Sequence, residues 1–211
     1  MKHSIFYLTG MGGTLHTGLG RAILDRGYDV TGRQLSGEFR NISFQDQINT
    51  VCNDLKEHFW HEDARVVCNS FGAYIFLHSQ AQLAKPYIGK VLLLSPIVGE
   101  FENQDTQMNF IPPRANVLME WAQSGSYPTP KQCEIHTGSE DWQSNPDNVT
   151  KFGELVGINV TVVPDGGHNL PHSYVGAVLD KWLSHTQANP TTQDRRIAFD
   201  DLCPSSSQQP P

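Results

Sequence analysis

The stretch Arg65–Leu77, which reads RVVCNSFGAYIFL, decides the fold of this chain. The apolar run at Arg65–Cys68 has the length of a buried strand, and the residues that follow Ser70 have the length and spacing of a helix. A side chain at such a corner is lifted above the sheet on a strained backbone, so the residues two positions away must be small, as Cys68 and Gly72 are. The pattern predicts a strand–turn–helix unit with Ser70 as a candidate nucleophile. An ordinary helix N-cap is the alternative role for Ser70.

Short apolar runs recur on both sides of this unit and are separated by stretches of helical length. Near-continuous apolar runs of this kind are typical of parallel strands that are covered on both faces. Strands are predicted at Ser4–Leu8, Arg65–Cys68, Val91–Ser95, Cys133–Thr137 and Asn159–Val163, with a weaker one at Tyr28–Val30. Helices are predicted at Leu19–Arg26, Phe44–Trp60, Phe71–Leu83, Ala115–Ser124, Pro146–Val156 and Tyr174–His185. The alternation predicts an α/β fold, a single doubly wound domain with about six mostly parallel strands flanked by helices.

This alternation stops near His185. Residues 1–185 are therefore predicted to form one domain, and residues 186–211 a flexible tail in which only Ile197–Phe199 and Leu202 could dock locally. The tail holds four prolines and three consecutive serines, a composition that buries little apolar surface. Between Pro96 and Lys131, one clear helix at Ala115–Ser124 and an irregular Gly99–Pro113 stretch leave too little chain for a large lid.

Composition excludes several classes of protein. Fifteen basic against 22 acidic residues give a net charge of −7 and a pI of about 5.6, which argues against nucleic acid and anionic membranes as partners. The longest apolar runs, such as Val91–Leu94, are too short to span a bilayer. The four cysteines have no CxxC spacing, and the sequence has no signal-peptide cleavage region. These features predict a cytoplasmic protein with reduced thiols. Because the number of cysteines is even, two disulfides are the alternative.

Two later loops carry residues that suit acid–base chemistry beside a serine. His168 follows the last predicted strand in the glycine-rich sequence VVPDGGHNLP, where a satisfied loop histidine is the alternative. Asp141 follows the predicted strand at Cys133–Thr137 in the sequence HTGSED. The three candidates therefore occur along the chain in the order Ser, Asp, His.

These motifs together resemble the α/β-hydrolase superfamily over residues 1–185. The turn at Cys68–Gly72 is similar to the nucleophile elbow G-x-S-x-G of that family, with cysteine in place of the first glycine, and the Ser, Asp, His order is the order of the family. The resemblance implies a catalytic triad of Ser70, Asp141 and His168. Other carboxylates within reach of the same role are Glu140, Asp147 and Asp165.

The loop after the first predicted strand, Leu8–Thr14, reads LTGMGGT and resembles the oxyanion loop of the family, with Thr9 where histidine is usual. The resemblance implies that the backbone N–H groups of Met11 and Phe71 form the oxyanion hole. The alternative is that these glycines only make a tight turn between strand and helix.

The resemblance implies a serine hydrolase that cleaves a small acyl ester or thioester through an acyl-enzyme on Ser70, without metal or organic cofactor. Amide or carbon–carbon bond hydrolysis is equally compatible with these residues, and the oligomeric state stays open. Tentative substrate-binding residues are Leu15, His16, Ile97, Phe101, Trp142 and Leu170.

Two alternatives belong to other functional classes. The same fold can persist as a catalytically silent binding protein. The glycine-rich first loop is also similar to that of Rossmann-type dinucleotide-binding oxidoreductases, but the third glycine of their motif would fall on His16, which obstructs the approach of a pyrophosphate. The Tyr-x-x-x-Lys at Tyr127–Lys131 contains two prolines that prevent the helix such a motif needs.

Overall fold

The computed structural model describes residues 4–103 and 107–184. The predicted tail, residues 186–211, with its candidate docking positions Ile197–Phe199 and Leu202, lies outside the described residues. Within the described part of the chain, no helix is long and apolar enough to cross a membrane.

Six strands form one parallel sheet in the order β2-β1-β3-β4-β7-β8. They are β1 (Ser4–Met11), β2 (Asp29–Leu35), β3 (Arg65–Asn69), β4 (Lys90–Leu94), β7 (Gln132–Gly138) and β8 (Asn159–Val163). Each of the six predicted runs overlaps one of these strands, and two of them, Val91–Ser95 and Tyr28–Val30, extend one residue beyond it. The doubly wound α/β fold is confirmed. The strand order changes direction between β1 and β3, and such a point opens a crevice at the carboxyl ends of the strands.

The edge strand β2 is longer than the sequence indicated. The prediction covered Tyr28–Val30, whereas the strand runs from Asp29 to Leu35 and reads DVTGRQL. Glycine and polar residues interrupt the apolar pattern because β2 pairs with β1 alone and is only half-buried.

Helices cover both faces of the sheet. They are α1 (Gly18–Leu24), α2 (Gly37–Asn41), α3 (Phe44–His58), α4 (Phe71–Leu83), α5 (Val117–Gln123), α6 (Pro146–Val156) and α7 (His172–Ser184). The predicted bounds of α4 and α6 are correct. The prediction for α3 extends too far because Phe59, at φ −127°, leaves the helix and packs its ring 5.2 Å from that of Phe6.

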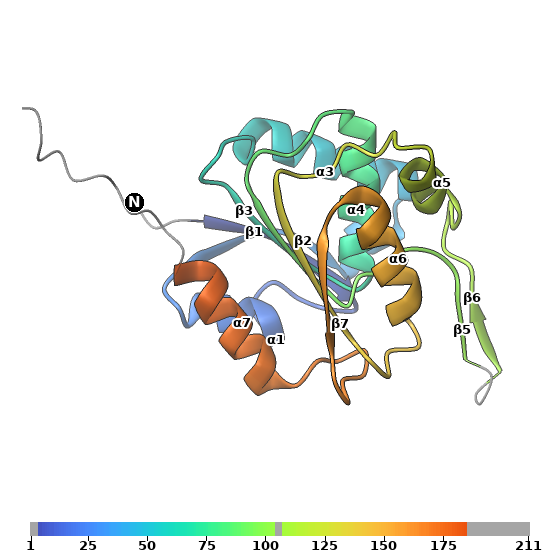
Figure 1. Cartoon of the computed structure of the whole chain (residues 1–211). Helices are drawn as coiled ribbons and strands as arrows, with labels where there is room; N and C mark the ends of the chain where they lie inside the picture. Colours follow the sequence, from blue (N-terminus) through green and yellow to red (C-terminus); the bar gives the residue numbers. More distant parts are fainter. Residues whose placement is uncertain (1–3, 104–106, 185–211) are drawn as a thin grey trace, which may run out of the picture.

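Side chains that alternate along the strands build two cores, one on each face of the sheet. On β1, Phe6 and Leu8 belong to one buried cluster, whereas Ile5 and Tyr7 belong to the other. The first cluster packs against α3, α4, α5 and α6, and the second against α1 and α7, which lie on the opposite side of the sheet (Figure 1).

A small hairpin replaces the irregular stretch that was expected at Gly99–Pro113. Strands β5 (Phe101–Asn103) and β6 (Met108–Phe110) pair antiparallel, and Figure 1 shows them projecting beyond α5 and α6, away from the main sheet. Strands of three residues are too short for an alternating pattern to be recognised, and the five-residue helix α2 was missed for the same reason.

Among the described helices, α4 is the most buried, since every residue from Phe71 to Gln80 is buried. His78 lies among rings of this core, with its own ring 4.5 Å from Tyr74 and 5.9 Å from Trp121. Neither ring nitrogen of His78 has a hydrogen-bond partner in the described part of the chain. Burial, together with the charge of Arg114, lowers the pKa of His78 from 6.5 to about 3.

The buried His78 should make stability depend on pH. Because its folded pKa is below its unfolded pKa of 6.5, the unfolded chain takes up the proton first, and stability is lost as the pH falls from about 6.5 toward 3. In that window, His78 should lower the free energy of unfolding by up to about 1.4 kcal/mol per pH unit. Urea unfolding at pH 7, 6, 5 and 4 should give a shallower pH dependence for His78→Phe than for the natural sequence, and equal slopes would contradict this account.

Candidate active site

Ser70 lies at the sharp turn between β3 and α4. Its backbone adopts φ 52° and ψ −125°, a region that non-glycine residues occupy at an energetic cost. The Ser70 N–H donates to the carbonyl of Leu94 at 3.0 Å, which fixes the turn to β4. The hydroxyl makes no capping bond to α4, so the alternative role as a side-chain N-cap is wrong.

Close packing around this turn explains the small residues beside it. A Cβ atom at Gly72 would overlap the carbonyl oxygens of Leu8 and Thr9, so only glycine lets α4 approach β1 this closely. Cys68 is fully buried in the core between its strand neighbours Leu8 and Leu93.

A chain of hydrogen bonds joins Ser70, His168 and Asp141. The Nε2 atom of His168 lies 2.8 Å from Ser70 Oγ. The Nδ1 atom lies 3.0 Å from each carboxylate oxygen of Asp141. When Asp141 is ionised it can only accept, so Nδ1 carries the proton and Nε2 accepts from the serine hydroxyl.

The carboxylate of Asp141 is held rigidly. It is 1% exposed, and its Oδ1 accepts hydrogen bonds from the N–H groups of Gln143 at 3.0 Å and Ser144 at 2.8 Å. The other three candidate carboxylates, on Glu140, Asp147 and Asp165, are exposed, and the hydrogen bonds of the His168 ring in the described structure go to Asp141 and Ser70.

Pairing of β7 with β8 explains how Asp141 and His168 meet. The loops that follow these neighbouring strands are joined by hydrogen bonds from the Ser139 N–H to the Val163 carbonyl at 2.9 Å and from the Glu140 N–H to the Gly166 carbonyl at 2.8 Å. The aspartate and the histidine are thereby brought to one edge of the sheet.

A cavity of about 250 Å³ opens beside Ser70, and we call it the Ser70 cavity. It is lined by Gly10, Met11, Asn69, Ser70, Phe71, Ile97, Phe101, Phe110, Gln143, His168 and Asn169. The N–H of Phe71 lies in the first turn of α4 and has no acceptor within that helix. Gly12, the residue after Met11, donates its N–H to the Leu35 carbonyl of β2 at 2.9 Å. Both predicted oxyanion residues therefore border the space in front of Ser70.

The predicted substrate-binding residues divide into four groups. Ile97 and Phe101 line the Ser70 cavity, whereas Leu170 lines a second cavity, the α1–α7 cavity, on the other side of His168. Trp142 packs against Phe101 with ring centroids 5.6 Å apart but lines a separate depression. The remaining two line neither cavity: Leu15 is partly buried against the core beside α1 and α7, and His16 is exposed.

Phe110 was missed by the sequence analysis. The β5–β6 hairpin stacks its ring on Phe101 at 5.0 Å and places it 6.3 Å from Phe71, at the wall of the Ser70 cavity. A single aromatic residue in a short polar stretch gives no signal of this position.

Asn69 was also missed, although its place at the end of a buried strand and directly before Ser70 is a usable signal. Its Oδ1 accepts hydrogen bonds from the Tyr7 hydroxyl at 2.8 Å and from the Gly10 N–H at 3.0 Å. Burial raises the pKa of Tyr7, which keeps the phenol protonated as a donor. Asn69 therefore ties the loop that carries Met11 to the turn that carries Ser70.

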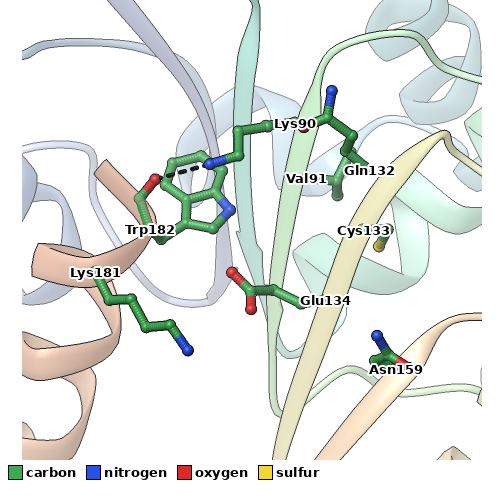
Figure 2. Close-up of a pocket in the computed structure, with 8 residues that line it drawn as sticks. All are labelled: Lys90, Val91, Gln132, Cys133, Glu134, Asn159, Lys181 and Trp182. Carbon is green, nitrogen blue, oxygen red and sulfur yellow. Dashed lines mark hydrogen bonds between the residues drawn. The ribbon is translucent and has the colours of Figure 1, made fainter. Parts of the chain in front are cut away.

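A third cavity, of about 260 Å³, lies at the opposite edge of the sheet, where β4, β7 and β8 begin. Figure 2 shows the Nζ atom of Lys90 in this cavity donating to the carbonyl oxygen of Trp182, at 3.1 Å, with Glu134 and Lys181 nearby. None of the residues that line it belongs to the Ser70–His168–Asp141 chain. The parts of the chain described here contain no group of three or more His, Cys, Asp or Glu side chains that could hold a metal ion.

No protein-family model matches the sequence, and no curated protein matches it. The structure is similar to alpha/beta hydrolase domain-containing protein 10 from mouse, with a TM-score of 0.59 at 11% identity, over 86% of this chain and 89% of the mouse chain. This chain has the α/β-hydrolase fold.

Two further structures share the α/β-hydrolase architecture. One comes from a study of carboxylesterases of the ammonia-oxidizing thaumarchaeon Nitrososphaera gargenis, with a TM-score of 0.54 at 12% identity, over 87% of this chain and 88% of that one. The other is an uncharacterized protein from Bacillus cereus, with a TM-score of 0.57 at 15% identity over 87% of this chain; the match spans only 59% of the length of that protein.

Removing the Asn69 side-chain acceptor should destabilise the fold. Asn69→Ala leaves the Gly10 N–H and the Tyr7 hydroxyl without their acceptor, and we expect a loss of about 1–3 kcal/mol in the free energy of unfolding. Tyr7→Phe removes one of these bonds and keeps the other, so its loss should be smaller. Urea unfolding of both variants tests the network, and a larger loss for Tyr7→Phe would contradict it.

Proposed function

We propose that this protein is a serine hydrolase that cleaves a small acyl ester or thioester through an acyl-enzyme on Ser70. The observation that carries the proposal is the hydrogen-bonded chain from Ser70 Oγ through both nitrogens of His168 to the buried carboxylate of Asp141. This is the arrangement in which a serine hydroxyl can lose its proton as it attacks a carbonyl carbon.

The reaction assigns a role to each residue. Ser70 Oγ attacks the carbonyl carbon while its proton passes to Nε2 of His168, and Asp141 stabilises the imidazolium through the Nδ1–H bond. His168 then donates that proton to the leaving oxygen or sulfur as the bond to it breaks. Water attacks the acyl-enzyme, again with His168 as base, and releases the acid and free Ser70.

The oxyanion that forms in the first step has a place in front of Ser70. The N–H groups of Met11 and Phe71 border the Ser70 cavity, and donors in such positions each stabilise the transition state by about 3–4 kcal/mol. The Asn69 bond to the Gly10 N–H fixes the residue before Met11, so the first of the two donors is held in place before substrate arrives.

Two observations favour a small acyl group. The Ser70 cavity has a volume of about 250 Å³, at or below the low end for drug-sized ligands. Its wall away from the triad is apolar, with Ile97, Phe101 and Phe110. The carboxylesterases of the thaumarchaeal study share this fold, which agrees with ester cleavage.

Covalent labelling tests the nucleophile. A fluorophosphonate probe should label the natural protein, and Ser70→Ala should lose both the label and the turnover of p-nitrophenyl acetate by several orders of magnitude. Ser173→Ala, which changes an exposed serine of α7, should keep both. Labelling that persists in Ser70→Ala would overturn the proposal, and an unlabelled natural protein would favour the catalytically silent binding protein.

Two carboxylates of the same loop region provide a matched test of the acid. Asp141→Asn should reduce turnover by roughly 10⁴-fold because the amide favours the wrong tautomer of the imidazole. Asp147→Asn should change turnover little, since Asp147 is exposed in the first turn of α6, where the helix dipole accounts for a carboxylate. Steady-state kinetics with p-nitrophenyl acetate would contradict the assignment if the two effects were reversed.

A further inference from the structure

The α1–α7 cavity adjoins the proposed catalytic residues on the side away from the Ser70 cavity. It has a volume of about 560 Å³ and lies between α1, α7 and the carboxyl ends of β1, β3 and β4. Its lining residues include Leu19 and Ala22 of α1, Val175 of α7, and Ser95, which directly follows β4. This volume is within the range of cavities that bind whole small molecules.

His168 stands between the two cavities. Asn69, His168 and Asn169 line both, whereas Met11 and Phe71 line only the Ser70 cavity. The carbonyl oxygen of a substrate must lie at the N–H groups of Met11 and Phe71, so the acyl group belongs in the Ser70 cavity. The leaving group must lie next to His168, which gives it a proton, and the α1–α7 cavity is the space beyond that ring.

Ser95, which lines the α1–α7 cavity, carries a buried hydroxyl that is not used in hydrogen bonding within the described structure. Ser95 is 3% exposed and has φ 45°, and its N–H donates to the His136 carbonyl at 2.7 Å. Its hydroxyl has no hydrogen-bond partner in the described structure. A buried hydroxyl without a partner is unfavourable, and a bound molecule in the cavity that Ser95 lines can supply that partner.

The charged side chains that line this cavity favour a neutral occupant over an ionic one. No aspartate or glutamate is among its lining residues in the described chain. The one arginine, Arg26, donates to Asp180 at 2.7 Å and to the carbonyl oxygens of Ala22 and Gly176 at 2.8 and 3.1 Å. The guanidinium is therefore already paired with a carboxylate, and the rest of the wall offers apolar side chains, hydroxyl groups, two side-chain amides and the imidazoles of His168 and His172.

We propose that the α1–α7 cavity binds the alcohol part of the substrate, a neutral alcohol larger than the acyl group, with a polar oxygen that hydrogen-bonds to Ser95 Oγ. The inference rests on the proposed function. The bond between Ser70 Oγ and the acyl carbon forms, the bond from that carbon to the alcohol oxygen breaks, and the serine proton reaches the alcohol oxygen through His168. The alcohol leaves from the α1–α7 cavity, and the short acyl group stays on Ser70 until water releases it.

A pair of isomeric esters tests which side of the scissile bond takes the bulk. 2-Naphthylmethyl acetate carries the naphthyl group on the alcohol, and methyl 2-naphthylacetate carries it on the acyl group. We expect kcat/KM at least tenfold higher for the first ester. Ala22→Phe, and independently Val175→Phe, should reduce that ratio toward one because the new ring occupies the cavity. Ala177→Phe, on the exposed face of α7, is the matched control and should leave the ratio unchanged.

A second pair tests the hydroxyl of Ser95. 6-Hydroxyhexyl acetate and heptyl acetate differ by a hydroxyl in place of a terminal methyl, on a chain flexible enough to explore the cavity. Ser95→Ala should lower the ratio of kcat/KM for the hydroxylated ester to that for heptyl acetate by roughly two- to tenfold, the effect of one hydrogen bond. An unchanged ratio would overturn the role of Ser95.

Failure of this inference is distinguishable from failure of the proposed function. If fluorophosphonate labels Ser70 and both naphthyl esters are hydrolysed, but methyl 2-naphthylacetate is preferred or folded Ala22→Phe and Val175→Phe keep the original ratio, only the assignment of the alcohol is overturned. If Ser70 is not labelled and neither ester is hydrolysed, the proposed function and this inference both fall.

Discussion

The sharp turn at Ser70 is the constraint on which the site depends. Holding a non-glycine residue at φ 52° costs about 1–3 kcal/mol, and the surrounding core keeps it there. Helix α4 is buried from Phe71 to Gln80, Gly72 lets it lie against the β1 carbonyls, and the Ser70 N–H is bound to β4. The turn cannot relax without separating α4 from the sheet, so the serine side chain stays above the sheet edge.

The order of the strands then determines what meets at that edge. β1 and β3 are neighbours at the point where the strand order changes direction, which brings the Gly10–Met11 loop beside Ser70. Asn69 strengthens this contact, because one side-chain oxygen accepts from both the loop and the β1 side chain Tyr7. On the other side, β4, β7 and β8 follow in order, and their loops supply Ser95, Asp141 and His168. Residues far apart in the sequence are thus assembled by parallel pairing alone.

The central elements were predictable from the sequence because they are uniform. Strands covered on both faces read as continuous apolar runs, and the buried central strands β3 and β4 lie within one residue of the predicted bounds Arg65–Cys68 and Val91–Ser95. The edge strand β2 and the β5–β6 hairpin were not predictable in this way. The half-exposed β2 mixes polar and apolar residues, and strands of three residues are too short to show an alternating pattern. The Ser, Asp, His order located the three residues that the structure joins by hydrogen bonds.

The walls around those residues were less predictable. Phe110 lines the Ser70 cavity because β5 pairs with β6. Leu15 packs against the core beside α1 and does not line the Ser70 cavity. Such positions depend on how a loop folds back on the domain, and a single sequence carries no local pattern for that.

The two cavities draw their walls from separate parts of the chain. The Ser70 cavity takes Phe101 and Phe110 from the hairpin that follows β4, while the α1–α7 cavity takes its walls from the first and last described helices, α1 and α7. Only Asn69, His168 and Asn169 line both. Changes at sites without shared contacts are close to additive in free energy. On the proposed function, selection for one side of the scissile bond can therefore change through the hairpin, and selection for the other through the helices, without moving the hydrogen-bonded chain between them.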